Sequence, residues 1–301
     1  MKDNRKTGRR VTGWDLIGTI CLAVVLVGAL VLGGICLTGC SLNGPILPVN
    51  PENVSITVDG ATPAVAGIHR RAVVWGLDHV DPQSYGGWNG DCPGTILDAL
   101  RMKALLERRG YLVCLLTNEQ ATAFRVTAAC VAAAQRMKAG DRLVAYGSSH
   151  GGQALDLNGD ENGGKDSTIC LWDGQFTDDL VGELLLRIRE NIDVDLILDC
   201  CNSGTMYRGP HDYVRIFKAR KQAKGFDIKC NLTYYGGCAD GKSSYGGDDG
   251  GAFTKALLSP GPEGLTRARW FESARMRMPR NQIPIFANFG PKNVTAEGAL
   301  K

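Results

Sequence analysis

The amino-acid sequence predicts an α/β fold in which a mostly parallel sheet of six strands lies between two layers of helices, preceded by an N-terminal membrane segment. Three observations support this prediction. From about residue 70, short apolar runs alternate with longer segments of helical periodicity. Helices of ten or more residues between strands require crossover connections, which join parallel strands. An uncharged apolar run near the N-terminus predicts the membrane segment.

Each strand is predicted from a short apolar run that follows a helix or a turn signal. The first has the sequence RAVVWGL and the fourth DVDLIL. An excursion rich in glycine and aspartate, Gln153–Asp173, separates the third strand from the helix that follows. The six predicted strands are Arg71–Leu77, Tyr111–Leu116, Asp141–Tyr146, Asp193–Leu198, Asn231–Tyr235 and Gln282–Phe286.

The helices are predicted from apolar residues that share one face. Thr95–Arg109 gathers its apolar side chains on one broad face, and Thr122–Lys138 begins with threonine and ends before a glycine. The five predicted helices are Thr95–Arg109, Thr122–Lys138, Thr177–Glu190, Gly251–Leu258 and Leu265–Arg277.

Charge and composition exclude several classes of protein. The chain is 44% apolar and 22% charged, which excludes an intrinsically disordered protein. Its formal net charge is +3, from 34 Lys and Arg against 31 Asp and Glu. Residues 1–40 hold five basic residues and two acids, so the remainder sums to zero. A neutral body gives no reason to expect nucleic acid as a partner.

The N-terminal 40 residues are predicted to be a signal or anchor segment. The uncharged run Leu16–Gly39 is long enough, at about 1.5 Å per helical residue, to cross a membrane of about 30 Å. Basic residues before the run orient the body outside the cytoplasm. The sequence around Cys40 resembles a bacterial lipobox, in which the cysteine is lipidated, so a lipoprotein signal and an uncleaved anchor both remain open.

The rest of the chain divides into three further regions. Residues 41–68 contain four prolines and are predicted to be a linker, with one short strand at Val54–Val58. Residues 69–290 form the predicted α/β domain, and residues 291–301 a C-terminal tail.

Eight of the 11 cysteines lie in the body of the chain. An even number in an exported protein is compatible with disulfides, whereas several of these cysteines lie inside apolar runs typical of buried thiols. Their pairing stays open. The spacing of cysteine and histidine does not indicate a zinc site.

A histidine and a cysteine follow two of the predicted strands. His150 follows the third strand and precedes two glycines, and Cys201 follows the fourth strand. In parallel sheets, functional sites lie beyond the carboxyl ends of strands. A thiolate nucleophile needs a base nearby and backbone donors for the oxyanion, and Gly151 allows such close approach. We therefore predict a Cys201/His150 dyad, with the adjacent Cys200 in the core.

These motifs resemble those of metacaspases and bacterial orthocaspases. Tyr146–Gln153 is similar to their Y-S-G-H-G-x-Q motif, with the tyrosine one residue further upstream, and Asp199–Gly204 is similar to their D-x-C-H-S-G motif. The resemblance spans about residues 71–290 and implies a peptidase domain of the caspase-hemoglobinase type. Flanking segments that match in order are Asp98–Leu106, Leu116–Thr122, Asp156–Glu161, Asp178–Asp179, Cys238–Asp240 and Gly250–Leu258.

The resemblance implies a role for each residue of the dyad. Cys201 is the nucleophile, His150 is the general base and then the general acid, and the backbone N–H groups of Gly151 and Cys201 form the oxyanion hole. Two departures from the family pattern leave these groups intact. Asn202 replaces a histidine that is not the base, and Ser149 replaces the glycine before His150.

Relatives of this type cleave after Arg or Lys, which carboxylates in the substrate pocket bind. Asp199 matches one of these acids, and its position two residues before Cys201 puts it on the same strand face. Asp98 matches a second pocket acid, although an exposed charge early in a helix is an equal alternative. A carboxylate pairs bidentately with a guanidinium, so we expect a protein or peptide substrate with a basic residue before the scissile bond.

No cofactor is required for this chemistry. Calcium is a candidate activator, because Asp166, Asp178 and Asp179 match three of the calcium ligands of metacaspases. The acidic loop between the two motifs does not fit an EF-hand, since Ile169 stands where a bidentate glutamate is needed. The alternative is a solvated turn and ordinary charges at a helix start.

Two other functions remain open from the sequence. One is a catalytically inactive caspase-like interaction module, and the other is a legumain-like or gingipain-like peptidase of the same fold. The basic stretch Arg208–Lys229 is either an exposed self-processing loop or a solvated helix. We expect the protein to be a monomer.

Overall fold

A computed structural model describes residues 68–157, 164–207, 228–259 and 261–290. The predicted membrane segment with Cys40, the short strand Val54–Val58 and the C-terminal tail lie outside these residues, as does most of the basic stretch Arg208–Lys229. Within the described ranges, none of the helices is both long enough and apolar enough to cross a membrane.

The predicted six-stranded, mostly parallel sheet is confirmed. Its strands lie in the order β11-β8-β7-β3-β1-β2. Within this sheet the five strands β2, β1, β3, β7 and β8 pair in parallel, and β11 pairs with β8 in the antiparallel direction. The strands are β1 Arg70–Gly76, β2 Leu112–Thr117, β3 Arg142–Ser148, β7 Asp193–Asp199, β8 Asn231–Gly236 and β11 Ile285–Phe289.

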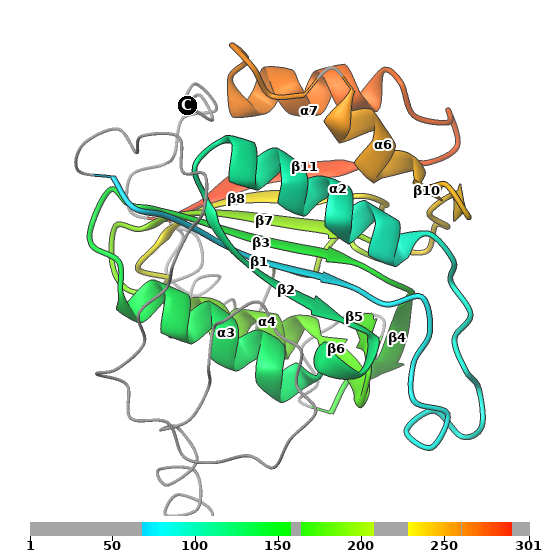
Figure 1. The fold of residues 1–301 in the computed structure, drawn as a ribbon. Helices are drawn as coiled ribbons and strands as arrows, with labels where there is room; N and C mark the ends of the chain where they lie inside the picture. The colour runs from blue at the N-terminus through cyan, green and yellow to red at the C-terminus, as the bar shows by residue number, and fades with distance from the viewer. Residues whose placement is uncertain (1–67, 158–163, 208–227, 260, 291–301) are drawn as a thin grey trace, which may run out of the picture. The chain divides into compact units, whose positions relative to one another are not determined.

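Helices cover both faces of this sheet and complete the three layers. Figure 1 shows α2, α6 and α7 on one face and α3 and α4 on the other. A short 3-10 helix, η2 (Asn118–Gln120), follows β2. The α-helices are α2 Thr95–Arg108, α3 Ala123–Gln135, α4 Asp178–Leu186, α6 Ala252–Leu258 and α7 Arg267–Arg275.

The two faces of the sheet bury two separate hydrophobic cores. Val73 of β1 is fully buried against the α3 and α4 side, and its neighbour Val74 is fully buried against the α2, α6 and α7 side. Successive side chains on a strand point to opposite faces, so a strand covered by helices on both faces is apolar throughout. This is why the strands have continuous apolar sequences instead of alternating ones.

A second, smaller sheet was not predicted. β4 (Gly151–Leu155), β5 (Lys165–Leu171) and β6 (Gly174–Thr177) form an antiparallel sheet beyond the ends of β3 and β7. Parts of the excursion Gln153–Asp173, for which the sequence predicted no strand, thus belong to β4 and β5. Its polar residues Asp166, Ser167 and Thr168 are buried in β5, where the sequence alone indicates a solvated turn.

The last strand begins three residues later than predicted. Pro284 precedes β11 and has no N–H to donate to a neighbouring strand, so pairing with β8 begins at Ile285. Gln282 is buried and lies before the strand, where its side chain makes hydrogen bonds elsewhere. The prediction placed an unusual buried amide inside a strand, and the structure places it in the preceding turn.

Candidate functional site

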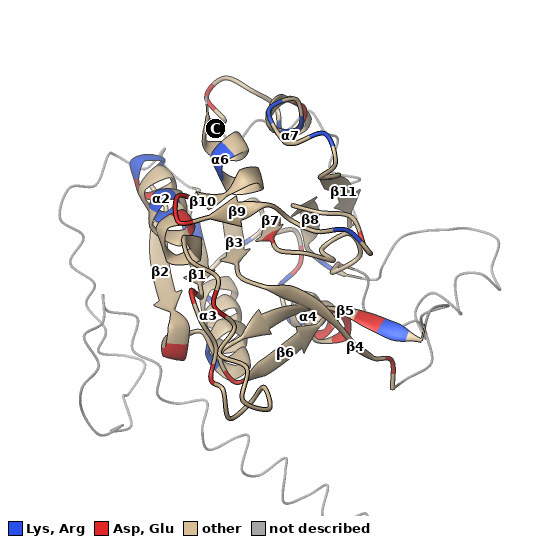
Figure 2. Cartoon of the chain, turned by 90° about the vertical axis from the view of Figure 1, so that its right-hand side faces the viewer, with Lys and Arg blue, Asp and Glu red and all other residues tan. Residues whose placement is uncertain are grey.

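His150 and Cys201 lie next to each other in the fold because their strands are neighbours. β3 and β7 pair in parallel, with Ser148 opposite Asp199 in the register. His150 and Cys201 each follow two residues later, so the two side chains occur at equal distances beyond the carboxyl ends of adjacent strands. Figure 2 views the molecule from this end of the sheet, where basic and acidic residues are interspersed.

The two motifs are in backbone contact at Gly151. A Cβ atom at this position would lie 1.8 Å from the carbonyl oxygen of Cys201 and 2.9 Å from its nitrogen. Only glycine permits this approach. The backbone N–H of Ser149 also donates to the carbonyl oxygen of Asp199 at 3.3 Å. The loop after β3 is thus fixed against the loop after β7.

The imidazole of His150 is held by a loop that follows β1. Its Nε2 atom lies 3.1 Å from the carbonyl oxygen of Asp91. A carbonyl only accepts hydrogen bonds, so this contact places the proton on Nε2 and leaves the lone pair of Nδ1 available. The indole of Trp88 packs on the imidazole, with ring centroids 4.9 Å apart.

The two adjacent cysteines have different surroundings. Cys201 is half-buried, and its Sγ accepts a hydrogen bond from the backbone N–H of Ser244 at 3.2 Å. Cys200 is buried in the core, and this burial raises the pKa of its thiol well above the ordinary value. The prediction that Cys200 is a core residue is confirmed. Of these two cysteines, only Cys201 has access to solvent.

Asp98 and Asp199 form a buried pair of carboxyl groups beside Cys201. A Cβ atom on Gly251 would lie 2.2 Å from Asp199 Oδ2 and 3.1 Å from Asp98 Oδ2, so both acids face the backbone of this one glycine. Gly250 comes as close to Asp98 Oδ1, with a Cβ atom there 2.1 Å away. These glycines belong to the short hairpin β9 (Gly246–Gly247) and β10 (Gly250–Gly251), which the sequence did not predict.

Most oxygens of the pair have hydrogen-bond donors. Asp199 Oδ2 accepts from the backbone and the hydroxyl of Thr254, at 2.9 and 2.7 Å, and its Oδ1 accepts from Ser244 at 3.1 Å. Asp98 Oδ2 accepts from the Gly251 N–H at 2.7 Å and from Ser148 at 3.2 Å. Asp98 Oδ1 is buried and accepts no hydrogen bond from the described residues.

Two nearby cations, Arg101 and Lys255, bind elsewhere. Arg101 donates to the carbonyl oxygen of Asp249 at 2.6 Å, and Lys255 contacts the carboxylate of Asp249 at 2.7 Å. Among the described residues, none of the lysines or arginines forms an ion pair with Asp98 or Asp199. The site therefore has two buried acids without a basic partner.

The charge state of the pair reflects this environment. Burial, followed by the proximity of Asp199, raises the pKa of Asp98 to about 7. Burial also raises the pKa of Asp199, although its hydrogen bonds from Thr254 and Ser244 oppose the shift. Two acids that are costly to ionise in isolation become favourable ligands for a cation that enters between them.

Sequence reasoning missed Gln282, which holds in place the segment that contacts Cys201. Its Nε2 donates to the carbonyl oxygen of Gly237 at 2.8 Å and to Ser244 Oγ at 3.0 Å, and its Oε1 accepts from the Tyr245 N–H at 3.0 Å. The chain separates Gln282 from Ser244 by 38 residues. No motif links them, and the only sequence signal is a glutamine at the first position of a predicted strand.

The two departures from the family motifs have local explanations. Asn202 has a positive φ of 51°, a conformation that asparagine tolerates better than most residues, and its Oδ1 accepts from the Gly241 N–H at 2.8 Å. The hydroxyl of Ser149 donates to the carbonyl oxygen of Cys170 at 2.6 Å. Both residues stabilise the loops that carry the dyad.

The predicted calcium ligands come from two elements of the described structure. Asp166 lies in β5, and Asp178 and Asp179 begin α4. Among the described residues, no three His, Cys, Asp or Glu side chains are grouped closely enough to hold a metal ion. Residues 158–163 of the acidic loop lie outside the described part of the chain. No step of the chemistry below depends on calcium.

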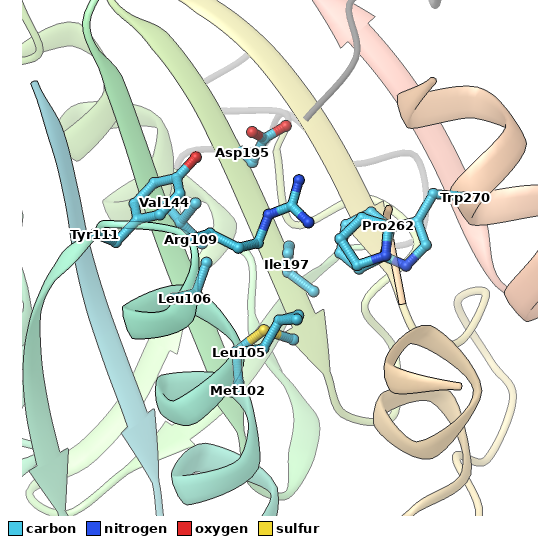
Figure 3. Close-up of a pocket in the computed structure, with 10 residues that line it drawn as sticks. All are labelled: Met102, Leu105, Leu106, Arg109, Tyr111, Val144, Asp195, Ile197, Pro262 and Trp270. Atoms are coloured by element: carbon cyan, nitrogen blue, oxygen red, sulfur yellow. The ribbon is translucent and has the colours of Figure 1, made fainter. Parts of the chain in front are cut away.

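The cysteines and the cavity of the structure add two negative findings. None of the eight cysteines in the described ranges is in a disulfide. A small cavity lies between α2, β3, β7 and Trp270, with Asp195 and Tyr111 at one end and Met102 at the other (Figure 3). The cavity has a volume of about 10 Å³, enough for about one water molecule. It is lined by residues other than those of the dyad.

Comparisons with known proteins agree with this architecture. The profile of the family described as Caspase domain matches residues 69–288. Metacaspase-1 of Mycosarcoma maydis is 32% identical over 158 residues, which cover 48% of this chain and 38% of that protein. Metacaspase-2 of Arabidopsis thaliana is 32% identical over 164 residues, covering 50% of this chain and 38% of that protein.

A solved structure extends the likeness over the whole domain. The crystal structure of protein GSU0716 from Geobacter sulfurreducens aligns with a TM-score of 0.65 and 30% identity, covering 77% of this chain and all of that one. This chain spans less than half the length of the curated metacaspases cited above.

Proposed function

The chain belongs to the caspase domain family and carries a caspase-like cysteine peptidase domain, and from this premise we propose that it is an endopeptidase that cleaves after Arg or Lys. The observation that carries the proposal is the buried acid pair, Asp98 and Asp199, beside Cys201. Asp98 Oδ1 lacks a hydrogen-bond partner among the described residues, which suits a guanidinium or ammonium group from outside.

The first half of the reaction forms an acyl-enzyme. His150 Nδ1 takes the thiol proton of Cys201, and the thiolate attacks the carbonyl carbon of the basic residue. The oxygen becomes an oxyanion, which the backbone N–H groups of Gly151 and Cys201 stabilise. The C–N bond then breaks, and His150 returns the proton to the leaving amine. Its Nε2 contact with Asp91 keeps the correct nitrogen turned toward the reacting atoms.

The second half releases the acyl group. A water molecule loses a proton to His150 Nδ1 and attacks the thioester carbonyl, and the C–S bond breaks. The thiol of Cys201 recovers its proton from His150, which restores the starting state. The Ser244 N–H stabilises negative charge on the sulfur while it is a thiolate.

A panel of reporter peptides tests the proposal. Peptides with Arg, Lys, Asp or Asn before the scissile bond, and otherwise identical, are incubated with the full chain with and without a calcium chelator. We expect hydrolysis of the Arg and Lys peptides only. Preference for Asp or Asn would exclude the acid pair as the specificity site.

Calcium activation and membrane attachment are separate proposals that rest on the sequence. The acids Asp166, Asp178 and Asp179 support the first by resemblance, and activity unchanged by the chelator would exclude it. The basic and apolar residues 1–40 support attachment with the domain outside the cytoplasm. Membrane fractionation of the full chain tests this, and a Cys40→Ala variant distinguishes a lipoprotein from an uncleaved anchor.

A further inference from the structure

The loop between β1 and α2, residues 77–94, is held by hydrogen bonds to itself and to a neighbouring strand, and we call it the arm. Three backbone hydrogen bonds close it on itself: Val80 N–H to Asn89, Gly87 N–H to Pro82 and Cys92 N–H to Asp78, at 2.8, 2.7 and 2.7 Å. The hydroxyl of Tyr85 donates to the carbonyl oxygen of Leu171 at 2.7 Å and ties the arm to β5. The arm therefore presents its side chains in fixed positions.

Trp88 of this arm is exposed beside the imidazole of His150. Its side chain is 45% exposed, although its ring packs on His150 with centroids 4.9 Å apart. Tyr85 supports it from another side in an edge-to-face contact at 5.8 Å. An aromatic ring held by contacts on two sides and open to solvent elsewhere is a preorganised apolar surface.

The chemistry of the proposed reaction decides which part of the substrate meets this surface. His150 must protonate the leaving amine, so that nitrogen comes within about 3 Å of the imidazole. The amine belongs to the residue after the scissile bond, called P1′, while the basic residue before the bond, called P1, enters the pocket of Asp98 and Asp199. The P1′ side chain starts one atom from the leaving amine and lies beside the ring that covers His150.

We propose that Trp88 is a specificity-determining residue that binds an apolar or aromatic P1′ side chain of the substrate. The inference rests on the proposed peptidase function and adds a second recognition element on the leaving-group side. The exposed Asp91, whose carbonyl oxygen contacts His150, adds negative charge near the same place and disfavours an acidic P1′ residue. Apolar contact with the indole and repulsion by the carboxylate thus act in the same direction.

Quenched peptides that share Arg at P1 and differ only at P1′ test the inference on the full chain. We expect kcat/KM to be about tenfold higher with Phe or Leu at P1′ than with Ser, and lowest with Asp. In Trp88→Ala, the rates for Phe, Leu and Ser should converge to within about threefold. Trp88→Phe should keep most of the preference. A peptidyl-Arg methyl ester, whose leaving group has no side chain, reports on the dyad alone.

A matched control and two outcomes make the test decisive. Phe124→Ala removes another exposed aromatic, 51% exposed at the start of α3, and should leave the P1′ preference unchanged. Equal losses in Trp88→Ala on every peptide and on the ester would show that Trp88 only supports His150, and would overturn the inference. Rapid ester and peptide hydrolysis without a P1′ preference would also overturn it while leaving the peptidase function intact. Failure of the wild type to hydrolyse either kind of substrate would overturn both.

Discussion

Two buried aspartates on strand β7 have opposite surroundings. Asp195 pairs with buried Arg267 through two contacts, Oδ1 to Nε at 2.7 Å and Oδ2 to Nη2 at 2.9 Å. Asp199, four residues later on the same face of the strand, has hydroxyl and backbone donors and a second acid, Asp98, nearby. One carboxylate has its cation within the fold, and the other has none.

We infer that Asp195 stabilises the fold, whereas Asp199 serves the proposed substrate site. In a buried ion pair with both partners present, each charge is compensated by the other, and no further charged group is needed. A buried acid pair without a cation is unfavourable alone and becomes favourable when a basic side chain enters. Arg101 and Lys255, which lie near the pair, make their printed hydrogen bonds to Asp249 instead, to its carbonyl oxygen and its carboxylate respectively.

The largest expected effect on stability comes from breaking the ion pair between Asp195 and Arg267. Asp195→Ala leaves the guanidinium of Arg267 buried and unpaired, which should lower the free energy of unfolding by about 3–5 kcal/mol. Urea denaturation measures this loss. Replacing both residues, in Asp195→Leu/Arg267→Met, should recover much of the stability. Catalytic activity per folded molecule should remain, so a selective loss of activity in the stable double variant would contradict the assignment.

The largest expected effect on activity comes from changing the acid pair of Asp98 and Asp199. Asp199→Asn keeps the shape and removes the charge, and should lower kcat/KM for an Arg peptide by about a hundredfold or more, since losing one partner of a buried charge pair costs about 2–5 kcal/mol. The free energy of unfolding should stay the same or rise. A citrulline peptide, the neutral analogue of the Arg peptide, serves as the control. Equal losses on both peptides would mean that Asp199 only maintains the fold of the site.

Gln282 provides an intermediate effect. Gln282→Met removes three hydrogen bonds that hold the segment contacting Cys201, and should reduce kcat/KM by about thirtyfold, or about 2 kcal/mol. Because the segment donates to the nucleophile, the loss should appear mainly in kcat. Gln135→Met, at the exposed end of α3, is the matched control and should have no effect. A change confined to thermal stability would reduce Gln282 to a structural residue.

The pH dependence should give the smallest effect. Asp98 has a pKa of about 7, raised by burial and by Asp199, while Arg101 and the donors Ser148 and Gly251 oppose the shift. As the pH rises through 7, Asp98 gains charge and binds a cation better. The ratio of kcat/KM for the Arg peptide to that for the citrulline peptide should therefore rise by up to about tenfold between pH 6 and 8.

The ratio removes the titration of the catalytic residues, since both peptides depend on them equally. In Asp98→Asn it should become flat across this range. The pH dependence of the free energy of unfolding gives a second check. A carboxyl group whose pKa is raised on folding lowers stability as the pH rises from about 4 toward 7, so Asp98→Asn should gain stability relative to the wild type over that interval. A ratio that still rises in Asp98→Asn would assign the dependence to another group.

Much of the fold could be predicted because the central sheet follows local rules. Buried parallel strands are apolar throughout, and their helices are amphipathic, so most of the elements were found within a few residues of their bounds. Thr122 and Thr177 were correctly placed at helix starts, where their side chains accept from the backbone N–H three residues on. These signals are contained in a short window of sequence.

The missed features depend on contacts between distant residues. The small sheet of β4, β5 and β6 buries polar residues whose sequence resembles a solvated turn, and the hairpin of β9 and β10 consists of glycines. Gln282 reaches Ser244 through a hydrogen bond, and Trp88 reaches His150 through ring packing, and neither contact follows a sequence motif. The resemblance predicts the acids Asp98 and Asp199, but the lack of an ion-pair partner for either among the described residues is visible only in three dimensions.

The most direct test of the account is covalent labelling of the full chain with a peptidyl-Arg ketone, followed by mass spectrometry to locate the label. We expect label on Cys201 in the wild type and in Cys200→Ala, no label in Cys201→Ala, and much slower labelling when Asp98 and Asp199 are both replaced by asparagine. An Asp-ketone probe should label none of these proteins. Label that persists in Cys201→Ala, or labelling by the Arg probe at an unchanged rate without the two acids, would contradict it.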